Sequence, residues 1–207
     1  MIRTGMRLLG AGAALALAAC ASAPLHYYTL VAPAGESAGG LVAQSATPSL
    51  PFELLPVSVP AQVDQPQLVV REGGQGVALL GSERWIAPLN DEVRSALSAD
   101  LARELRSQDV SGMPGSDKPV LRIKLDLRRF DSQPGSYALI EGAWSVRLLR
   151  GEHPTALACT SRINESVGPG YDALVAGHQR ALGALAGQIA TAARMLGNGQ
   201  TPVCPAG

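Results

Sequence analysis

One cysteine near the start of the chain stands in a setting that points to covalent lipid attachment. Arg3 and Arg7 form a short positive segment, and residues 8–19 contain only Leu, Ala and Gly. This run is shorter than the roughly 20 apolar residues that a membrane-spanning helix needs, but it suits the apolar core of an export signal. It ends in Leu17-Ala18-Ala19-Cys20, the residue order of a bacterial lipobox.

The chemistry expected at Cys20 is acylation. Its thiol can accept a diacylglyceryl group, and cleavage before it frees an amino terminus for a further acyl chain such as palmitate. One chain alone anchors only marginally, whereas a multiply acylated cysteine holds a protein stably on a membrane. Ala21 and Ser22 follow, rather than Asp, which favours the periplasmic face of the outer membrane if the organism has one. An ordinary export signal with an incidental cysteine is the alternative.

Cleavage leaves two further cysteines, Cys159 and Cys204. Because the periplasm is oxidising, we expect a disulfide that ties the C-terminal tail to a strand. Two free thiols are the alternative. In the chain-entropy model, a loop of this size adds about 3–4 kcal/mol of stability. No histidine lies at metal-ligand spacing from either cysteine, so no metal site is predicted.

Sequence signatures of enzymes are missing. There is no G-x-S-x-G, no H-E-x-x-H and no phosphate loop. Gly74-Gln75-Gly76 begins a G-x-G pattern, but Leu79 occupies the third glycine position. His178 falls on the apolar side of a predicted helix, as is typical of a partly buried, hydrogen-bonded histidine, while His26 and His153 are expected to face solvent. We therefore predict a non-enzymatic protein without a cofactor.

The charge balance argues against a nucleic-acid partner. The export signal holds two of the 17 basic residues and none of the 17 acidic ones, which leaves a net charge of −2. No basic run occurs, and aromatic residues are few. Arg122, Lys124, Arg128 and Arg129 gather around one predicted strand. Such a group is usually a solvated face, and the alternative is a contact with acidic lipid headgroups or an acidic partner.

The remaining 188 residues suffice for one domain with a substantial core. We divide the chain into an export signal (1–19), the lipidated cysteine with a short tether (20–25) and a single domain (26–207). Residues 32–50 are rich in Ala, Gly, Ser and Pro and are predicted to form a flexible loop. Five tether residues reach at most about 18 Å, so the domain should lie close to the bilayer.

Period-two patterns predict most of the sheet. Val120 to Arg128 alternates apolar and charged residues almost without fault, so one side should face a core and the other water. Gly73, Gly74 and Gly76 are expected in a longer loop of a hairpin. The predicted strands are 26–31, 53–59 (an edge strand, because of Pro56), 67–71, 77–80, 120–128, 138–148 and 155–167.

Two helices are predicted. The first follows Arg84-Trp85 and Pro88-Leu89, with Asn90 as its N-cap and an apolar stripe of Val93, Ala96, Leu97, Leu101 and Leu105. The second covers 171–196, with an apolar stripe that includes Leu182, Leu185 and Ile189 and with Gly197 as its C-cap glycine. Gly183 and Gly187 should let it approach the sheet closely; a self-association face is the alternative. The expected fold is α+β: a two-layer sandwich of a mainly antiparallel sheet with two amphipathic helices on one face.

Short motifs follow the lipobox in a distinctive order. They are Tyr27-Tyr28-Thr29-Leu30, Val57-Ser58-Val59-Pro60, Gln67-Leu68-Val69-Val70-Arg71, and Arg84-Trp85 with Pro88-Leu89. In this order the chain resembles the PqiC/YmbA family, the auxiliary lipoproteins of ABC-type transport systems, over nearly all of its mature length. Gln65-Pro66 and Ile86-Ala87 depart from the residues that the family tends to carry there.

The resemblance implies a non-enzymatic part of a lipid-transport machine that pairs an ABC transporter or membrane permease with an MCE-domain protein. The lipoprotein would be its outer-membrane docking component, and a homo-oligomer is left open. The predicted partner-facing residues are Arg84, Trp85, Gly73, Gly74 and Gly76, with the core as the other place for Trp85. A lipoprotein that carries a lipid or small ligand, and an envelope scaffold lipoprotein, are the alternative functions.

Overall fold

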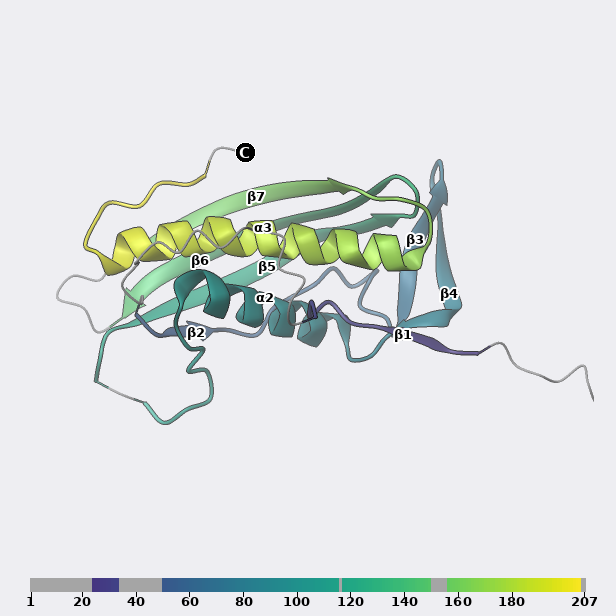
Figure 1. The fold of residues 1–207 in the computed structure, drawn as a ribbon. Helices are drawn as coiled ribbons and strands as arrows, with labels where there is room; N and C mark the ends of the chain where they lie inside the picture. The colour runs from purple at the N-terminus through teal and green to yellow at the C-terminus, as the bar shows by residue number, and fades with distance from the viewer. Residues whose placement is uncertain (1–23, 34–49, 116, 150–155, 206–207) are drawn as a thin grey trace, which may run out of the picture.

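The computed structural model describes residues 24–33, 50–115, 117–149 and 156–205 (Figure 1). The lipobox with Cys20, most of the predicted loop at 32–50 and His153 lie outside them. The described strands form two sheets, with the orders β1-β4-β3 and β2-β5-β6-β7. The elements are β1 (His26–Tyr28), β2 (Phe52–Leu54), β3 (Gln67–Gly73), β4 (Gly76–Trp85), α2 (Leu89–Leu105), β5 (Val120–Gln133), β6 (Tyr137–Leu149), β7 (Ala156–Ser166) and α3 (Tyr171–Gly197).

The four-stranded sheet is the main body of the fold. Strands β5, β6 and β7 form an antiparallel meander, and the short β2 pairs parallel to β5 at the edge. The alternation predicted for β5 is confirmed, because Ile123 and Leu125 are buried while Arg122 and Lys124 are exposed. Pro56 follows β2, and pairing resumes only at an isolated bridge between Ser58 and Asp126, as expected of an interrupted edge strand.

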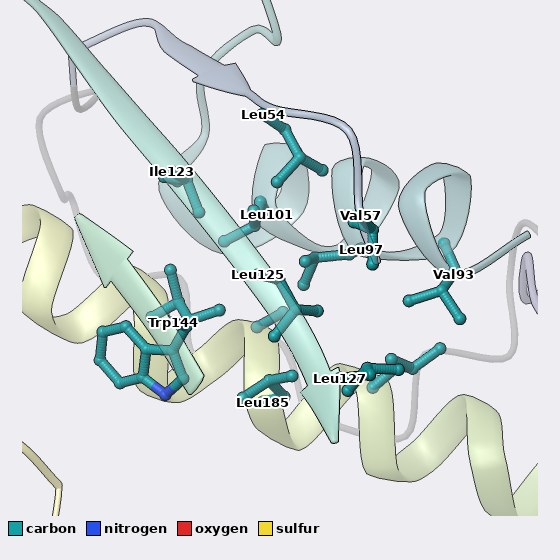
Figure 2. Close-up of a cluster of buried hydrophobic side chains, with 14 of the residues drawn as sticks. Leu54, Val57, Val93, Leu97, Leu101, Ile123, Leu125, Leu127, Trp144 and Leu185 are labelled. Carbon is teal, nitrogen blue, oxygen red and sulfur yellow. The ribbon is translucent and has the colours of Figure 1, made fainter. Parts of the chain in front are cut away.

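Both helices lie on the same face of this sheet (Figure 1). The predicted stripes are buried, so Leu97 and Leu101 of α2 and Leu185 of α3 meet Leu125 of β5 in one core (Figure 2). The α+β sandwich with helices on one face is therefore confirmed. No described helix is long and apolar enough to cross a membrane.

The close approach of α3 to the sheet depends on a different glycine from those predicted. A Cβ on Gly177 would lie 2.3 Å from Val167 Cγ1 and 3.0 Å from Ala138 Cβ, so only glycine fits there. A Cβ on Gly187 would meet nothing within 4 Å, and one on Gly183 would first meet Asp100 of α2. The prediction for Gly183 and Gly187 was wrong, because a Cβ at either position would have no atom of the sheet within 4 Å.

The helix ends also differ from the prediction. Helix α2 begins at Leu89 with Pro88 as its N-cap, since the Pro88 carbonyl accepts bonds from the amides of Asp91 and Glu92. Asn90 is thus inside the helix. Gly197 is the last helical residue of α3, and the left-handed glycine is Gly199, with φ of 70°.

The second sheet is smaller. Strands β3 and β4 form a hairpin in which Gly73 pairs with Gly76, so the turn is two residues long rather than the longer loop predicted. Gly73 and Gly74 have φ values of 99° and 57°, which suit tight hairpin turns and favour glycine. Strand β4 extends to Trp85, where β1 pairs parallel to its last three residues.

The predicted disulfide is present in the structure. Cys159 of β7 is bonded to Cys204, 45 residues further along the chain. The bond ties the segment after α3 to the edge of the four-stranded sheet.

Candidate interaction face

The residues predicted to meet a partner lie on the three-stranded sheet but do not form one patch. Gly73, Gly74 and Gly76 surround the hairpin turn, whereas Arg84 and Trp85 lie at the far end of β4. At the usual strand rise, the two groups are roughly 25 Å apart. A single small contact surface cannot include both.

Trp85 is a core residue. It is 6% exposed, and its indole meets the ring of Phe130 edge-on with 6.0 Å between the centroids. Its amide donates to the Pro66 carbonyl. Trp85 was predicted either to contact a partner or to lie in the core, and the structure places it in the core. Arg84 is partly exposed, and its Nε donates to the Gly81 carbonyl at 3.3 Å.

An irregularity in β4 determines which side chains share a face of this sheet. Strand β3 alternates regularly, with Leu68 and Val70 buried. Val69 pairs with Leu79, while Gln67 pairs with Arg84, so between these pairs β3 advances two residues and β4 five. Because these two advances differ by an odd number, the alternation of side chains along β4 shifts by one residue between Leu79 and Arg84, as it does at a β-bulge. Leu79 and Arg84 consequently lie on the same face although their numbers differ by an odd count.

The outer face of the three-stranded sheet is defined by Tyr27, Arg71, Val77, Leu79 and Arg84. Tyr27 pairs with Arg84, and Val77 pairs with Arg71, which places all five on the side of Val69. Tyr27, Val77 and Leu79 are 55%, 55% and 56% exposed. This face therefore combines half-exposed apolar side chains with two cations.

Two more exposed apolar residues flank the same strands. Leu25 directly precedes β1, and Ile86 directly follows β4. They are 49% and 60% exposed. The Ile86 amide donates to the Tyr28 carbonyl at 2.9 Å, so the ends of β1 and β4 are joined there. Most of the large exposed apolar side chains in the described part of the chain thus gather on and beside β1 and β4.

The inner face of this sheet carries a buried carboxylate. Glu83 accepts hydrogen bonds from the Tyr28 hydroxyl at 2.8 Å, from His26 Nδ1 at 3.0 Å and from the Ser82 hydroxyl at 3.2 Å. Burial alone would raise the pKa of Glu83, but these bonds bring it below its ordinary value. Burial and the bond to Glu83 raise the pKa of Tyr28. His26 faces solvent as predicted, since its side chain is 57% exposed, and it also bonds to Glu83.

A second buried carboxylate holds the next part of the N-terminal segment. Glu92, in the first turn of α2, is 4% exposed. It accepts hydrogen bonds from the Thr29 hydroxyl and the Leu30 amide, both at 2.8 Å. The segment that leads away from Cys20 is thus bound to the domain through Glu83 and Glu92.

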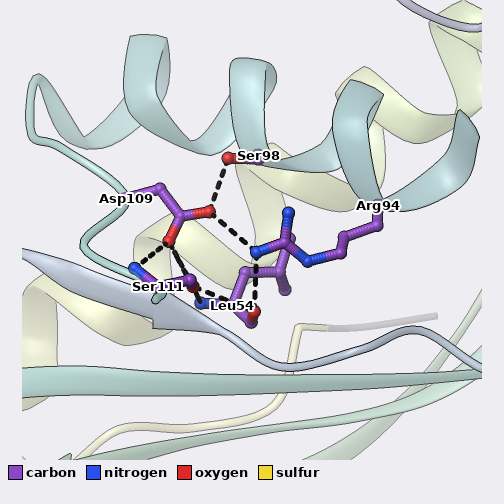
Figure 3. Close-up of polar contacts among 5 residues, drawn as sticks. All are labelled: Leu54, Arg94, Ser98, Asp109 and Ser111. Atoms are coloured by element: carbon purple, nitrogen blue, oxygen red, sulfur yellow. Dashed lines mark hydrogen bonds and ion pairs between the residues drawn. The ribbon is translucent and has the colours of Figure 1, made fainter. Parts of the chain in front are cut away.

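A polar network along the middle of α2 holds the edge strand β2 (Figure 3). Asp109 accepts bonds from the Ser98 hydroxyl at 2.7 Å and the Ser111 amide at 2.9 Å. Arg94 and Ser111 bond in turn to the carbonyl of Leu54. Burial would raise the pKa of Asp109, but the bonds from Ser111 and Ser98 lower it. These groups connect α2, the following loop and β2.

His178 is fully buried rather than partly buried. Its ring stacks on Phe130 with 3.9 Å between centroids, and Nε2 bonds with the Ser132 hydroxyl at 2.8 Å. Nδ1 has no partner among the described residues. Burial lowers the pKa of His178 to about 3, so the ring is neutral at physiological pH. His178 is therefore a core residue whose ring packs on Phe130.

The helix-free face of the four-stranded sheet holds an open groove of about 720 Å³. Small outward residues line it, together with Lys124 and Arg128 of β5 and with Cys204 and Pro205 of the tail. Arg122 is paired with Glu53, and Arg129 with Asp131. Within the described part, Lys124 and Arg128 make no ion pair. The small lining residues are Ala143, Ser145, Ala158 and Thr160.

Comparison with known proteins gives a family and a fold. The family model described as "ABC-type transport auxiliary lipoprotein component" matches residues 28–190. No curated protein matches the chain. A crystal structure of an uncharacterised protein superposes with a TM-score of 0.61 at 18% identity, over 81% of this chain and 97% of the other. Protein XCC0632 from Xanthomonas campestris, of the family DUF330, gives 0.54 at 18% identity, over 86% and 98%.

Proposed function

Because this chain belongs to the family of ABC-type transport auxiliary lipoprotein components, we propose that it is the outer-membrane docking component of a system that moves lipids across the periplasm. The observation that carries the proposal is the family match over residues 28–190. Its partners would be an MCE-domain protein and, through it, an ABC transporter or membrane permease. The protein would take no part in catalysis.

The proposed mechanism is placement. Acylation of Cys20 would hold the amino terminus in the periplasmic leaflet of the outer membrane, and a tether of five residues would keep the domain within about 18 Å of it. The bonds from Thr29 and Leu30 to Glu92 make the start of the domain a firm attachment rather than a loose arm. Confinement at the membrane raises the effective concentration, so modest partner contacts suffice.

Two surfaces are available for the transport partner. One is the β3–β4 hairpin, where the contacts predicted from the sequence, Arg84 and the glycine turn, lie at opposite ends of β4, while Trp85 is buried in the core. The groove on the helix-free face is the other. We favour the groove, because Lys124 and Arg128, which make no ion pair with any described residue, line it together with small residues onto which an acidic helix or strand can lie flat. The three-stranded sheet, by contrast, lies next to the proposed anchor.

The ligand-carrier alternative requires an enclosed apolar cavity. The groove is instead open, and Lys124, Asp126 and Arg128 contribute to its lining. The described core between sheet and helices is filled by Leu97, Leu125 and their neighbours. A scaffold role without transport is distinguished by the partners that the protein binds.

The proposal is tested by site-specific crosslinking in intact envelopes. A photoreactive residue replaces Thr160 in the groove, and a matched one replaces Arg84 on the other sheet. We expect Thr160 to capture an MCE-domain protein, identified by mass spectrometry. Capture of only envelope scaffold proteins from both positions would overturn the transport role, and capture of the MCE-domain protein from position 84 alone would move the contact to the hairpin.

A further inference from the structure

We infer that the outer face of the three-stranded sheet rests on the phospholipid surface, with Tyr27, Val77 and Leu79 inserted among the headgroups. This inference goes beyond the docking role and rests on the proposed acyl anchor at Cys20. It concerns how the domain is oriented on the membrane, not only that it is tethered there.

The first argument is where the exposed apolar side chains lie. Tyr27, Val77 and Leu79 share one face and are each more than half exposed. Leu25 and Ile86 extend this apolar surface along the ends of β1 and β4. These side chains follow the face along the length of β4, from the hairpin turn to the end that pairs with β1, and exposed apolar surface of this kind is characteristic of a surface that contacts a partner or a membrane.

The second argument is distance. Tyr27 is the second residue of β1, and only five residues separate β1 from Cys20. The tether therefore spans at most about 18 Å, less than the thickness of one bilayer. Because β1 is paired to β4 and Glu83 and Glu92 bind the residues around it, the end of the sheet that carries Tyr27 stays close to the anchor.

The third argument is chemical. Tyrosine is enriched at membrane interfaces, where its ring lies among the acyl chains and its hydroxyl stays hydrated. Arg71 and Arg84 lie on the same face as the three apolar side chains, and guanidinium groups bind phosphate oxygens. Arg71 already bonds Asp131 at 2.6 Å, so Arg84, next to Tyr27, is the cation offered to lipid. Half-exposed apolar groups beside a cation therefore gain more favourable contacts in the headgroup region of a phospholipid bilayer than in water.

The test uses the full mature lipoprotein in vesicles of phosphatidylethanolamine and phosphatidylglycerol. Trp85 and Trp144 are buried (6% and 2% exposed), so a Tyr27→Trp variant adds one exposed tryptophan to a buried background. Part of the lipid carries bromine on its acyl chains. We expect a roughly two-fold or larger fall in the added fluorescence, since interfacial side chains lie about 5–10 Å into the headgroup and acyl boundary.

The matched control is Thr160→Trp, which places the probe on the exposed helix-free face. We expect it to escape bromine quenching and to be quenched by acrylamide in the water. Leu79→Trp is an independent probe of the inferred face and should behave as Tyr27→Trp does. Adding Leu79→Glu to Tyr27→Trp should weaken the bromine quenching, because a carboxylate is costly to desolvate.

Mass spectrometry of Cys20 separates the two proposals. An acylated protein in which the tryptophans introduced at positions 27 and 79 are quenched by acrylamide and not by bromine would overturn the membrane contact alone. A chain without acylation at Cys20 would overturn the anchor and, with it, this orientation. Protection of position 27 that requires the transport partner rather than lipid would assign the face to that partner instead.

Discussion

The two sheets of this protein use their faces in opposite ways. The four-stranded sheet has one face covered by α2 and α3, and Leu125 at its centre is fully buried. The three-stranded sheet packs its inner side onto the core through Trp85 and Leu68. Its outer side leaves Tyr27, Val77 and Leu79 half exposed. One sheet thus builds the core, and the other presents surface.

The difference also concerns what holds each sheet in place. The four-stranded sheet depends on apolar packing, because the side chains of two helices fill its covered face. Strand β1 has only three residues, and buried carboxylates, Glu83 and Glu92, fix it and the segment that follows it. Hydrogen bonds define position sharply, whereas apolar contacts supply most of the stability. The smaller sheet is therefore placed accurately without adding much core.

The largest effect should come from comparing one leucine on each sheet. Leu125→Ala removes a fully buried side chain and should cost about 2–5 kcal/mol of the free energy of unfolding. Leu79→Ala removes a side chain that is 56% exposed and should change stability by about 0.5 kcal/mol or less. Urea unfolding followed by circular dichroism measures both. Equal losses would contradict the assignment of Leu79 to a free surface.

Removing the disulfide should be the next largest change, and it acts on the four-stranded sheet. Cys204→Ser frees the tail from β7 and should cost about 2–4 kcal/mol, since the bond closes a loop of 45 residues. Reduction of the parent protein should reproduce the loss. Bromine quenching of the Tyr27→Trp probe should be unchanged, because the bond joins the tail to β7, which belongs to the other sheet. A disulfide variant that alters quenching would show that the two sheets are coupled.

Most of the four-stranded half could be predicted from the sequence. The alternation in β5 and the apolar stripes of α2 and α3 are local patterns with a fixed period. Each pattern therefore indicates which side of its strand or helix faces the core. Leu97, Leu101 and Leu185 were all predicted on the correct side. The order of the three strands in the meander follows because only short segments of sequence connect them.

The three-stranded half could not be predicted in the same way. Its strand β1 pairs parallel with a strand 57 residues later, and the phase of β4 changes between Leu79 and Arg84. Neither the long-range pairing of β1 nor the shift in β4 produces a repeating pattern of residues in the local sequence. Glu83, two residues before Trp85, was a signal of a buried polar group, but the sequence does not identify the residues that bond to it. The partner-facing residues were predicted by resemblance, which carried no information on the burial of Trp85.

A third prediction concerns pH and the core beneath both sheets. Burial lowers the pKa of His178 to about 3 from 6.5, so the folded protein keeps the ring neutral while the unfolded chain takes up a proton below pH 6.5. Stability should therefore fall as pH decreases from 6.5 towards 3, by about 1.4 kcal/mol per pH unit. His178→Phe removes this contribution and keeps the stacking on Phe130.

The measurement is the free energy of unfolding at pH 6.5 and pH 5 for both proteins. The parent should lose about 2 kcal/mol more than His178→Phe over this interval. Ser132→Ala is the control, because it removes the hydrogen bond to Nε2 but leaves the buried ring. It should lower stability while keeping the slope of the parent. A parent and a His178→Phe variant with the same slope would show that His178 is accessible to water.

The smallest effect should separate two adjacent tyrosines of β1. Tyr28→Phe removes the hydroxyl that donates to Glu83 and should cost about 1 kcal/mol, whereas Tyr27→Phe should cost close to nothing because its ring is half exposed. The bonds lower the pKa of Glu83, so the stability that they provide is present above pH 4.5 and lost as pH falls through the folded value. The cost of Tyr28→Phe should consequently shrink in acid. A loss of stability in Tyr28→Phe that stays constant down to pH 3, or an equal loss in Tyr27→Phe, would mean that apolar contacts rather than the carboxylate hold β1. The two sheets would then be stabilised in the same way.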